Sequence, residues 1–195
     1  MNKINADTTW NLSGDGTLTI SGTGEVSYNN QCPKADIKTL VIGNGVTSIA
    51  SYTFKDCNAL TSITFGNSIE SIGVEAFRNC TALASLSLPN SLTTIGYDAF
   101  RNCTSLSSVA IPNSVTSMGS GVFLDCTGIT TATIGNSMTS VEWGTFRNCT
   151  SLTSVTLASS VTSINYESFK NTGFTSITIP NTVKTIDTDA FKECI

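Results

Sequence analysis

Phenylalanine recurs along this chain with a spacing of 23 residues. It stands at positions 54, 77, 100, 123, 146 and 169, and Phe191 follows after 22 residues. Cysteine keeps the same spacing three residues later, except that Thr172 takes one place in the series. A fixed period in this range is the signature of repeat proteins, whose units bury apolar surface against their neighbours. We therefore predict a linear stack of coils.

Each repeat carries two short apolar patterns that predict strands. The unit that starts at Leu83 reads LASLSLPNSLTTIGYDAFRNCTA. Its L-x-x-L-x-L part matches the strand that lines one face of a leucine-rich-repeat coil, and the Pro-Asn pair that follows is a turn signal. A second apolar pair, Leu92 and Ile95 in this unit, predicts another extended run on the opposite side. Coils are expected to begin near residues 37, 60, 83, 106, 129, 152 and 174, which makes about seven, with the last one incomplete.

An acidic residue two places before the repeated Phe and a basic residue just after it recur in four repeats. The pairs are Glu75/Arg78, Asp98/Arg101, Glu167/Lys170 and Asp189/Lys192. Residues three apart are neighbours on a helix, so this spacing predicts a single helical turn with an ion pair on its outer side. The expected fold class is a leucine-rich-repeat solenoid, mostly β with short helical or 3-10 turns, in a right-handed coil stack.

The first 35 residues do not carry the repeat. Residues 9–12 and 17–20 read as two strands around a turn at Asp15-Gly16. A solenoid needs a cap, because its first coil otherwise exposes a row of core side chains. We therefore divide the chain into an N-terminal β-hairpin cap, residues 1–35, and a leucine-rich-repeat solenoid, residues 36–195.

The repeated unit resembles the BspA-like leucine-rich repeats of bacterial and protist cell-surface proteins. The similarity rests on the pattern F-R-N-C-T-S-L-x-S-V-x-I-P-N-S-V-T-S-M/I-G and covers about residues 36–195. The resemblance implies a cell-surface or secreted protein, with attachment to host proteins or neighbouring cells as the usual role. The chain departs from that picture in lacking a signal and an anchor, and its last coil stops in mid-repeat, so we expect a piece of a longer surface protein.

Charge and residue inventory argue against several function classes. The net charge is −4, and ten scattered Lys and Arg residues do not make the dense basic patch that nucleic acid requires. No apolar run reaches the ~20 residues that cross a bilayer, so membrane insertion is not expected. Histidine is absent and no nucleophile or phosphate-loop motif is present, so we expect neither an enzyme nor a cofactor.

Six of the seven cysteines are expected to form an inner ladder with one thiol per coil. They are Cys57, Cys80, Cys103, Cys126, Cys149 and Cys194. Their spacing does not match the paired ligands of a zinc site, and parallel side chains fit the disulfide torsion badly. Buried thiols that act as small apolar groups are the main expectation, with a disulfide or a metal site as alternatives. Cys32 lies out of register and is the cysteine that we expect to be exposed.

Two surfaces are candidates for ligand binding. The outward residues of the first strand are nearly all Ser and Thr, whereas binding hot spots favour Trp, Tyr and Arg, so this face is a weak candidate. Its threonine ladder keeps ice binding open as a remote alternative. The aromatic residues expected to be exposed lie at the coil edges, and we expect any binding site on that lateral edge: Tyr52, Tyr97, Trp143 and Tyr166.

These features predict a non-catalytic module of the cell surface. The repeats would form a stiff display rod that makes contacts of its own with host or neighbouring-cell proteins or glycans. The alternative is a self-associating structural protein, in which the uncapped C-terminal coil pairs with another chain because its strand edges are otherwise bare.

Overall fold

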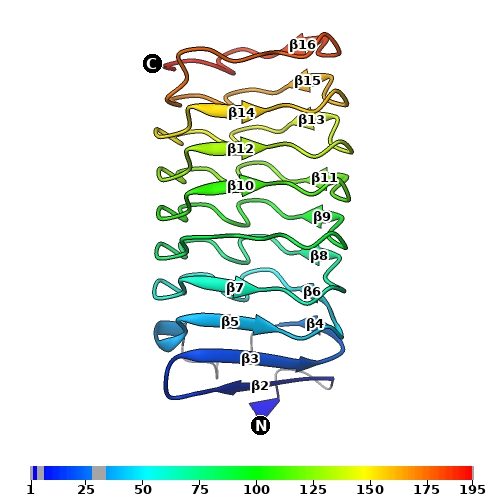
Figure 1. The fold of residues 1–195 in the computed structure, drawn as a ribbon, viewed down its shortest axis with the longest axis vertical. Helices are drawn as coiled ribbons and strands as arrows, with labels where there is room; N and C mark the ends of the chain where they lie inside the picture. Colours follow the sequence, from blue (N-terminus) through cyan, green and yellow to red (C-terminus); the bar gives the residue numbers. More distant parts are fainter. Residues whose placement is uncertain (1, 4–6, 28–33, 195) are drawn as a thin grey trace.

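The computed structural model describes residues 2–3, 7–27 and 34–194, and it shows a β-solenoid of about seven turns (Figure 1). The coils stack as successive rungs from the N-terminal end to the C-terminal end, so neighbours in space are one repeat apart in sequence. The predicted leucine-rich-repeat solenoid is confirmed. Cys32 lies outside the described residues.

Two columns of short parallel strands run along the rod. In-register pairing one repeat apart links most neighbouring strands, as between Ser108 and Thr131 in the first column and between Ser140 and Ser163 in the second, and each column is made of two sheets. The first column contains β3 (Thr17–Gly22), β5 (Thr39–Ile42), β7 (Ser62–Thr64), β10 (Ser108–Ala110), β12 (Thr131–Thr133) and β14 (Ser154–Thr156). The second contains β4 (Gly24–Val26), β6 (Val46–Ile49), β8 (Ser71–Ile72), β9 (Thr94–Ile95), β11 (Ser117–Met118), β13 (Ser140–Val141), β15 (Ser163–Ile164) and β16 (Thr185–Ile186).

The N-terminal end combines antiparallel and parallel pairing. Strand β1 (Asn2–Lys3) pairs antiparallel with β2 (Thr8–Leu12), and β2 pairs antiparallel with β3. Strands β3 and β4 also pair in parallel with β5 and β6, and the helix η1 (Lys34–Asp36) leads into β5. Strand pairing thus places β3 in one sheet with β5 and β7, and β4 in one sheet with β6, β8, β9 and β11. The domain division at residue 36 stays a prediction.

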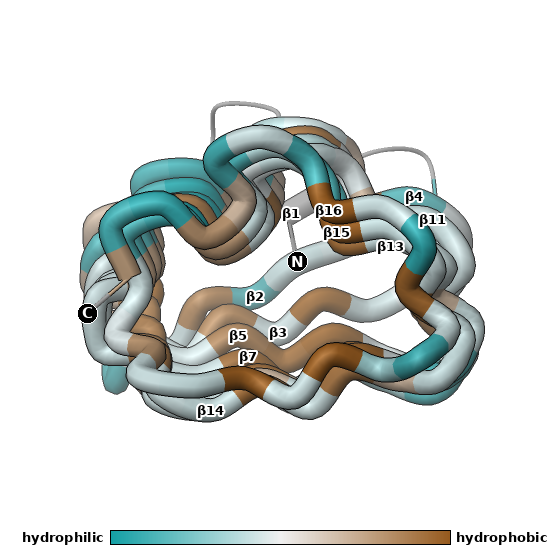
Figure 2. The backbone as a smooth tube through the Cα atoms, turned by 90° about the horizontal axis from the view of Figure 1, so that it is seen from above, coloured by the Kyte–Doolittle hydropathy of each residue, from teal (hydrophilic) through white to brown (hydrophobic). Residues whose placement is uncertain are grey.

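The apolar positions of the repeat face the inside of the coil, where they form continuous rows. Seen along the rod, apolar positions of successive coils lie behind one another (Figure 2). The repeated Phe rings stack from coil to coil, with centroids 5.3 to 5.7 Å apart and interplanar angles of 3 to 16°. Side chains of Phe77, Phe100, Phe123, Phe146 and Phe169 are fully buried. This ladder is the central part of the core, since each ring removes its neighbours from water.

Each coil closes through a turn around the repeated Phe that depends on left-handed backbone. The residues two before and two after the Phe have φ between 52° and 68°, for example Asp98 and Asn102 around Phe100. Alternate N–H groups donate to the next coil, as Phe77 N does to Ala99 O at 2.8 Å. A helix needs negative φ at every residue. The segment is thus a non-helical turn, unlike the single helical turn that the charge spacing predicted.

The coil around β16 is less covered than the others. Ile186 is 51% exposed, whereas the equivalent Ile164 and Val141 are buried. Phe191 and Cys194 are partly buried, whereas their counterparts in the previous coils are buried. No other coil within the described ranges packs against the far side of this one, which leaves part of its apolar row open.

Candidate functional site

The cysteine ladder is a structural feature of the core. From Cys80 onward, each thiol of the series lies just inside the turn and donates a hydrogen bond to the Phe carbonyl of the preceding coil, as Cys126 Sγ does to Phe100 O at 3.1 Å. Burial raises the pKa of the Cys80 and Cys149 thiols well above the ordinary value. Thiolates are the reactive form. These positions are therefore poor nucleophiles and serve as packing groups that also satisfy a buried carbonyl.

Thr172 shows what that place in the repeat requires. It is buried, and its Oγ1 donates to Phe169 O at 2.9 Å and lies 3.2 Å from Cys194 Sγ. A small buried side chain can thus take the place of the thiol, but its hydrogen bond goes to the Phe of its own coil and not to the Phe of the preceding one.

The charged residues of the turns pair with one another. All four predicted i, i+3 ion pairs form, including Arg78 with Glu75 at 3.0 Å and Lys170 with Glu167 at 2.8 Å. Pairs between coils add to them, with Lys55 Nζ 2.7 Å from Glu75 Oε2. Such paired surface charges contribute little stability each. Among the residues that the structure describes, these pairs also leave no row of unpaired cations on this side of the rod to attract an anionic polymer.

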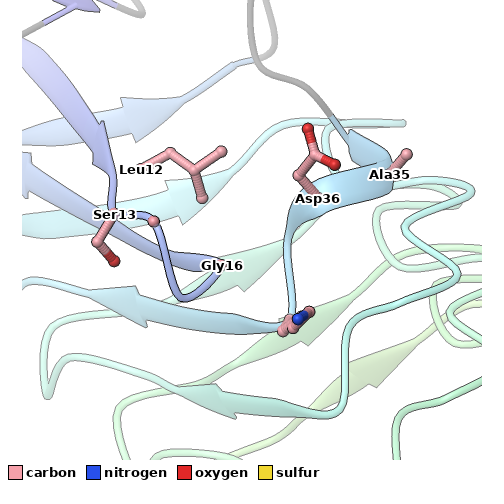
Figure 3. A pocket seen from close by; sticks show the side chains of 7 residues that line it. Leu12, Ser13, Gly16, Ala35 and Asp36 are labelled. Carbon is pink, nitrogen blue, oxygen red and sulfur yellow. The ribbon is translucent and has the colours of Figure 1, made fainter.

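A cleft of about 350 Å³ lies at the N-terminal end, between the β2–β3 turn and η1 (Figure 3). Its lining includes Leu12, Ser13 and Asp36. The nearby Asp15 carboxylate is engaged in the turn, because it accepts hydrogen bonds from Ser13 Oγ and from Thr17 N at 3.0 Å. These bonds hold the pKa of Asp15 below its ordinary value. The cleft brings together none of the predicted site residues.

One place at the start of the first strand face carries a hydroxyl group that bonds within the rod in several coils. Thr61 Oγ1 donates to Lys38 O at 2.9 Å, and Thr130 Oγ1 donates to Ser107 O at 3.1 Å in the same way. Each such bond ties one coil to the previous one. The hydroxyl at this place therefore acts as a link along the stack.

The four aromatic residues of the predicted edge are exposed. The exposed fractions are 51% for Tyr52, 60% for Tyr97, 37% for Trp143 and 43% for Tyr166. Tyr97, Trp143 and Tyr166 occupy the same place in their coils, three residues before the repeated Phe. Tyr52 lies one place later, at a left-handed position with φ 64°, and its ring faces Lys55 Nζ at 5.7 Å.

The three aligned rings form a column, which we call the aromatic column. The N–H of the left-handed residue in one coil donates to the carbonyl of the column residue in the next, as Glu75 N does to Tyr97 O and Gly121 N does to Trp143 O, both at 2.8 Å. Val74 and Ser120 hold the same place in coils without an aromatic. Ser120 therefore lies between the coil of Tyr97 and the coil of Trp143.

Polar side chains line one side of this column, and the sequence reasoning missed them. The place just before the aromatic column holds Gly73, Gly96 and Gly119 in three coils and then Glu142, Asn165 and Asp187. Asn165 Nδ2 donates to Glu142 Oε2 at 3.0 Å. The sequence signal that could have revealed them is the change from glycine to polar residues at this place after Gly119. A Cβ on Gly96 or Gly119 would lie 2.5 to 2.6 Å from the backbone of the preceding coil, so the corner is tight where glycine stands.

No three Cys, Asp or Glu side chains in the described ranges are grouped so that they could hold a metal ion. Among the same residues, no helix has the length and apolar character needed to cross a bilayer.

Comparison with known proteins identifies the repeat. Residues 26–141 and 71–195 match the family model described as the BspA type leucine rich repeat region, with six copies. No curated protein matches the chain significantly.

Solved structures share the architecture. A leucine rich cell surface protein from Faecalibacterium prausnitzii A2-165 is 32% identical over all of this chain and 52% of its own, with a TM-score of 0.77. The leucine-rich-repeat protein TpLRR of T. pallidum is 26% identical over 80% of this chain and 82% of its own, with a TM-score of 0.62. One from Bacteroides ovatus ATCC 8483, 19% identical over 95% and 61% of the two chains, shows the fold alone, with a TM-score of 0.62. The present chain spans about half the length of the F. prausnitzii protein.

Proposed function

Because the chain belongs to the family of BspA-type leucine-rich repeats, we propose that it is a non-catalytic binding and display module of a cell surface. The stacked coils form a rod that holds its side chains in fixed rows. The solved relative from F. prausnitzii is described as a cell surface protein, and this supports the same location here. Ligands at such a location are host or neighbouring-cell proteins and glycans.

The observation that carries the proposal is the aromatic column. Tyr97, Trp143 and Tyr166 are large, exposed and aligned on one narrow edge. Exposed Trp and Tyr are enriched at binding hot spots, because they present apolar area with few rotatable bonds. The stack does not require an aromatic there, since Val74 and Ser120 fill the same place in other coils.

A binding screen tests this proposal. The folded chain would be presented to extracellular-matrix proteins and to a glycan array, beside a triple variant with Tyr97→Ala, Trp143→Ala and Tyr166→Ala. Tyr52→Ala is the matched control, because it removes an equally exposed ring outside the column. We expect specific binding that the triple variant loses and the control keeps. Binding retained by the triple variant, or no binding to any member of either panel, contradicts the proposal.

Self-association is a second candidate, favoured by the partly open last coil. Ile186 on β16 is half exposed, and the apolar row beside it is partly uncovered. A second copy that packed there would cover both the row and the strand edges. Light scattering over a concentration series tests this: we expect dimers that Ile186→Glu abolishes. A strictly monomeric chain at high concentration refutes this candidate and leaves the binding proposal intact.

A further inference from the structure

The aromatic column is interrupted at one place by three small residues in a row. Residues 119–121 read Gly-Ser-Gly, and they lie one coil above Tyr97 and one coil below Trp143. We call them the 119–121 floor. Both neighbouring rings are exposed, and the small residues of the floor leave a low step in the edge between Tyr97 and Trp143. The equivalent three places in the neighbouring coils include at least one large side chain, as in Gly96-Tyr97-Asp98 and Glu142-Trp143-Gly144.

The width of this step suits one flat ring. The walls are two coils apart, which at the usual strand spacing is about 9.6 Å along the rod. A ring held between two surfaces needs one carbon–carbon contact of about 3.5 to 4.0 Å on each side, or about 7 to 8 Å in all. The spacing along the rod is therefore wide enough for a single six-membered ring between Tyr97 and Trp143.

A carboxylate reaches over the floor from the coil below. A Cβ added at Gly121 would lie 2.3 Å from Asp98 Oδ1, so that oxygen occupies the space which a side chain at Gly121 would fill. The other oxygen, Oδ2, lies 3.4 Å from Arg101 Nη1. Oδ1 can therefore accept a hydrogen bond from a ligand, and bonds from hydroxyl groups to a carboxylate are strong.

The backbone of the floor is already engaged in the stack. Gly119 N donates to Ile95 O and Gly121 N to Trp143 O, both at 2.8 Å, and Ser120 O accepts from Asp98 N at 3.0 Å. The floor therefore keeps its shape with or without a ligand. Recognition there falls to the two rings, the Ser120 hydroxyl and the Asp98 carboxylate.

We infer that the 119–121 floor is a seat for one unit of an uncharged glycan. A pyranose ring presents C–H faces that pack on aromatic rings and a rim of hydroxyls that donate hydrogen bonds. The Asp98 carboxylate suits a hydroxyl donor and repels a sugar acid, as does the net charge of −4. A stable protein interface buries about 800 Å² on each partner, far more than a step one ring wide offers. This inference rests on the proposed function and names the ligand class.

Fluorescence titration with short neutral oligosaccharides tests the inference, with uronic-acid oligosaccharides as the comparison. The chain has two tryptophans, and Trp10 is buried, so a change caused by a ligand reports on Trp143. We expect neutral sugars to shift the emission and Trp143→Ala to weaken binding about tenfold or more, as followed by calorimetry. Tyr97→Ala should weaken binding similarly, and Tyr52→Ala should leave it unchanged.

Two substitutions that the repeat itself accepts separate this seat from a general aromatic surface. Ser120→Tyr puts a tyrosine on the floor, and tyrosine already stands at the same place in two other coils, as Tyr97 and Tyr166. The fold should therefore persist while the new ring occupies the space proposed for the sugar. We expect loss of neutral-sugar binding, whereas a protein that binds along the edge would tolerate or gain from the extra ring. Asp98→Asn keeps a residue that tolerates positive φ and should weaken neutral-sugar binding about fivefold.

The outcomes distinguish the two levels of the proposal. Edge-dependent binding of proteins or acidic glycans alone overturns the neutral-glycan seat and leaves the binding module standing. Neutral-sugar binding that survives both Trp143→Ala and Ser120→Tyr also overturns the seat. If no extracellular-matrix protein and no glycan in the binding screen binds, both the neutral-glycan site and the proposed binding function are refuted.

Discussion

Replacing Asp98 by Ala and by Gly tests the left-handed turn that closes each coil. Asp98 has φ 53° and lies two residues before Phe100. The next two coils already have glycine at the equivalent place, Gly121 and Gly144, with φ 68° and 61°. Both variants lose the same ion pair with Arg101, so the difference between their free energies of unfolding reports the cost of the left-handed backbone conformation alone.

The sign and size of that difference follow from the geometry. An L-residue in the left-handed region costs roughly 1 to 2 kcal/mol, and glycine has no such cost. The ion pair itself, at 3.4 Å and partly exposed, contributes at most about 1 kcal/mol to both variants. We therefore expect Asp98→Gly to unfold within about 1 kcal/mol of the parent chain. Asp98→Ala should be less stable than Asp98→Gly by about 1 to 2 kcal/mol.

Urea denaturation measures these free energies, and thermal melting gives a second reading. For a chain of this size 1 kcal/mol corresponds to about 2 to 4 °C, so Asp98→Ala should melt about 2 to 8 °C below Asp98→Gly. If residues 98–101 formed a helical turn, the order would reverse, because Ala is more stable than Gly in a helix by roughly 0.5 to 1 kcal/mol. An alanine variant as stable as the glycine variant, or more stable, refutes the left-handed turn.

Three further predictions concern the core and the charged turns. Phe123→Ala, inside the ring stack, should cost about 3 to 5 kcal/mol in the free energy of unfolding, and the partly buried Phe191→Ala clearly less; equal losses by urea denaturation would argue against the stack. The Cys103 thiol, whose pKa is raised by a hydrogen bond to a neighbouring thiol and by burial, should resist a labelling reagent at pH 8 until urea unfolds the chain; rapid labelling of the native chain would contradict its burial. A hydrogen bond from Lys55 lowers the pKa of Glu75 below its ordinary 4.5. Its contribution to stability is thus present above pH 4.5 and lost as the pH falls through the lowered pKa, so the stability deficit of Glu75→Gln should shrink in acid, and a constant deficit would refute this.

The inward positions of the coil could be read from the sequence because they repeat. A residue such as Phe100 or Leu106 meets the same neighbours in every coil, so the same chemistry recurs every 23 residues. The period gave the coil boundaries, the two rows of strands and the cysteine ladder directly. The aromatic edge followed from the same register, apart from Tyr52, which lies one place further along its turn.

The turn conformation was harder to predict. The spacing of Glu75 and Arg78 suits a helix, and both helical and left-handed turns bring such a pair together. The deciding signal was the alternation of Asn, Asp and Gly at the places two before and two after the Phe, since these residues tolerate positive φ. Glu75 and Glu167 obscure that signal, because glutamate has no special preference for left-handed backbone. Their ion pairs stabilise a conformation that their side chains alone would not favour.

If the chain binds a ligand as proposed, recognition has to come from the places where the repeat is broken. A residue that recurs in every coil reflects the demands of stacking, which are the same for any ligand. Ser120 and Trp143 depart from their column neighbours without touching the stack, because the bonds that join their coils are made by backbone groups such as Gly121 N and Trp143 O. Substitutions at these places can therefore change binding while the free energy of unfolding stays nearly constant. Binding and stability can therefore be tested separately by mutation at this edge. Composition and periodicity describe what the coils have in common, so they carry little information about the ligand.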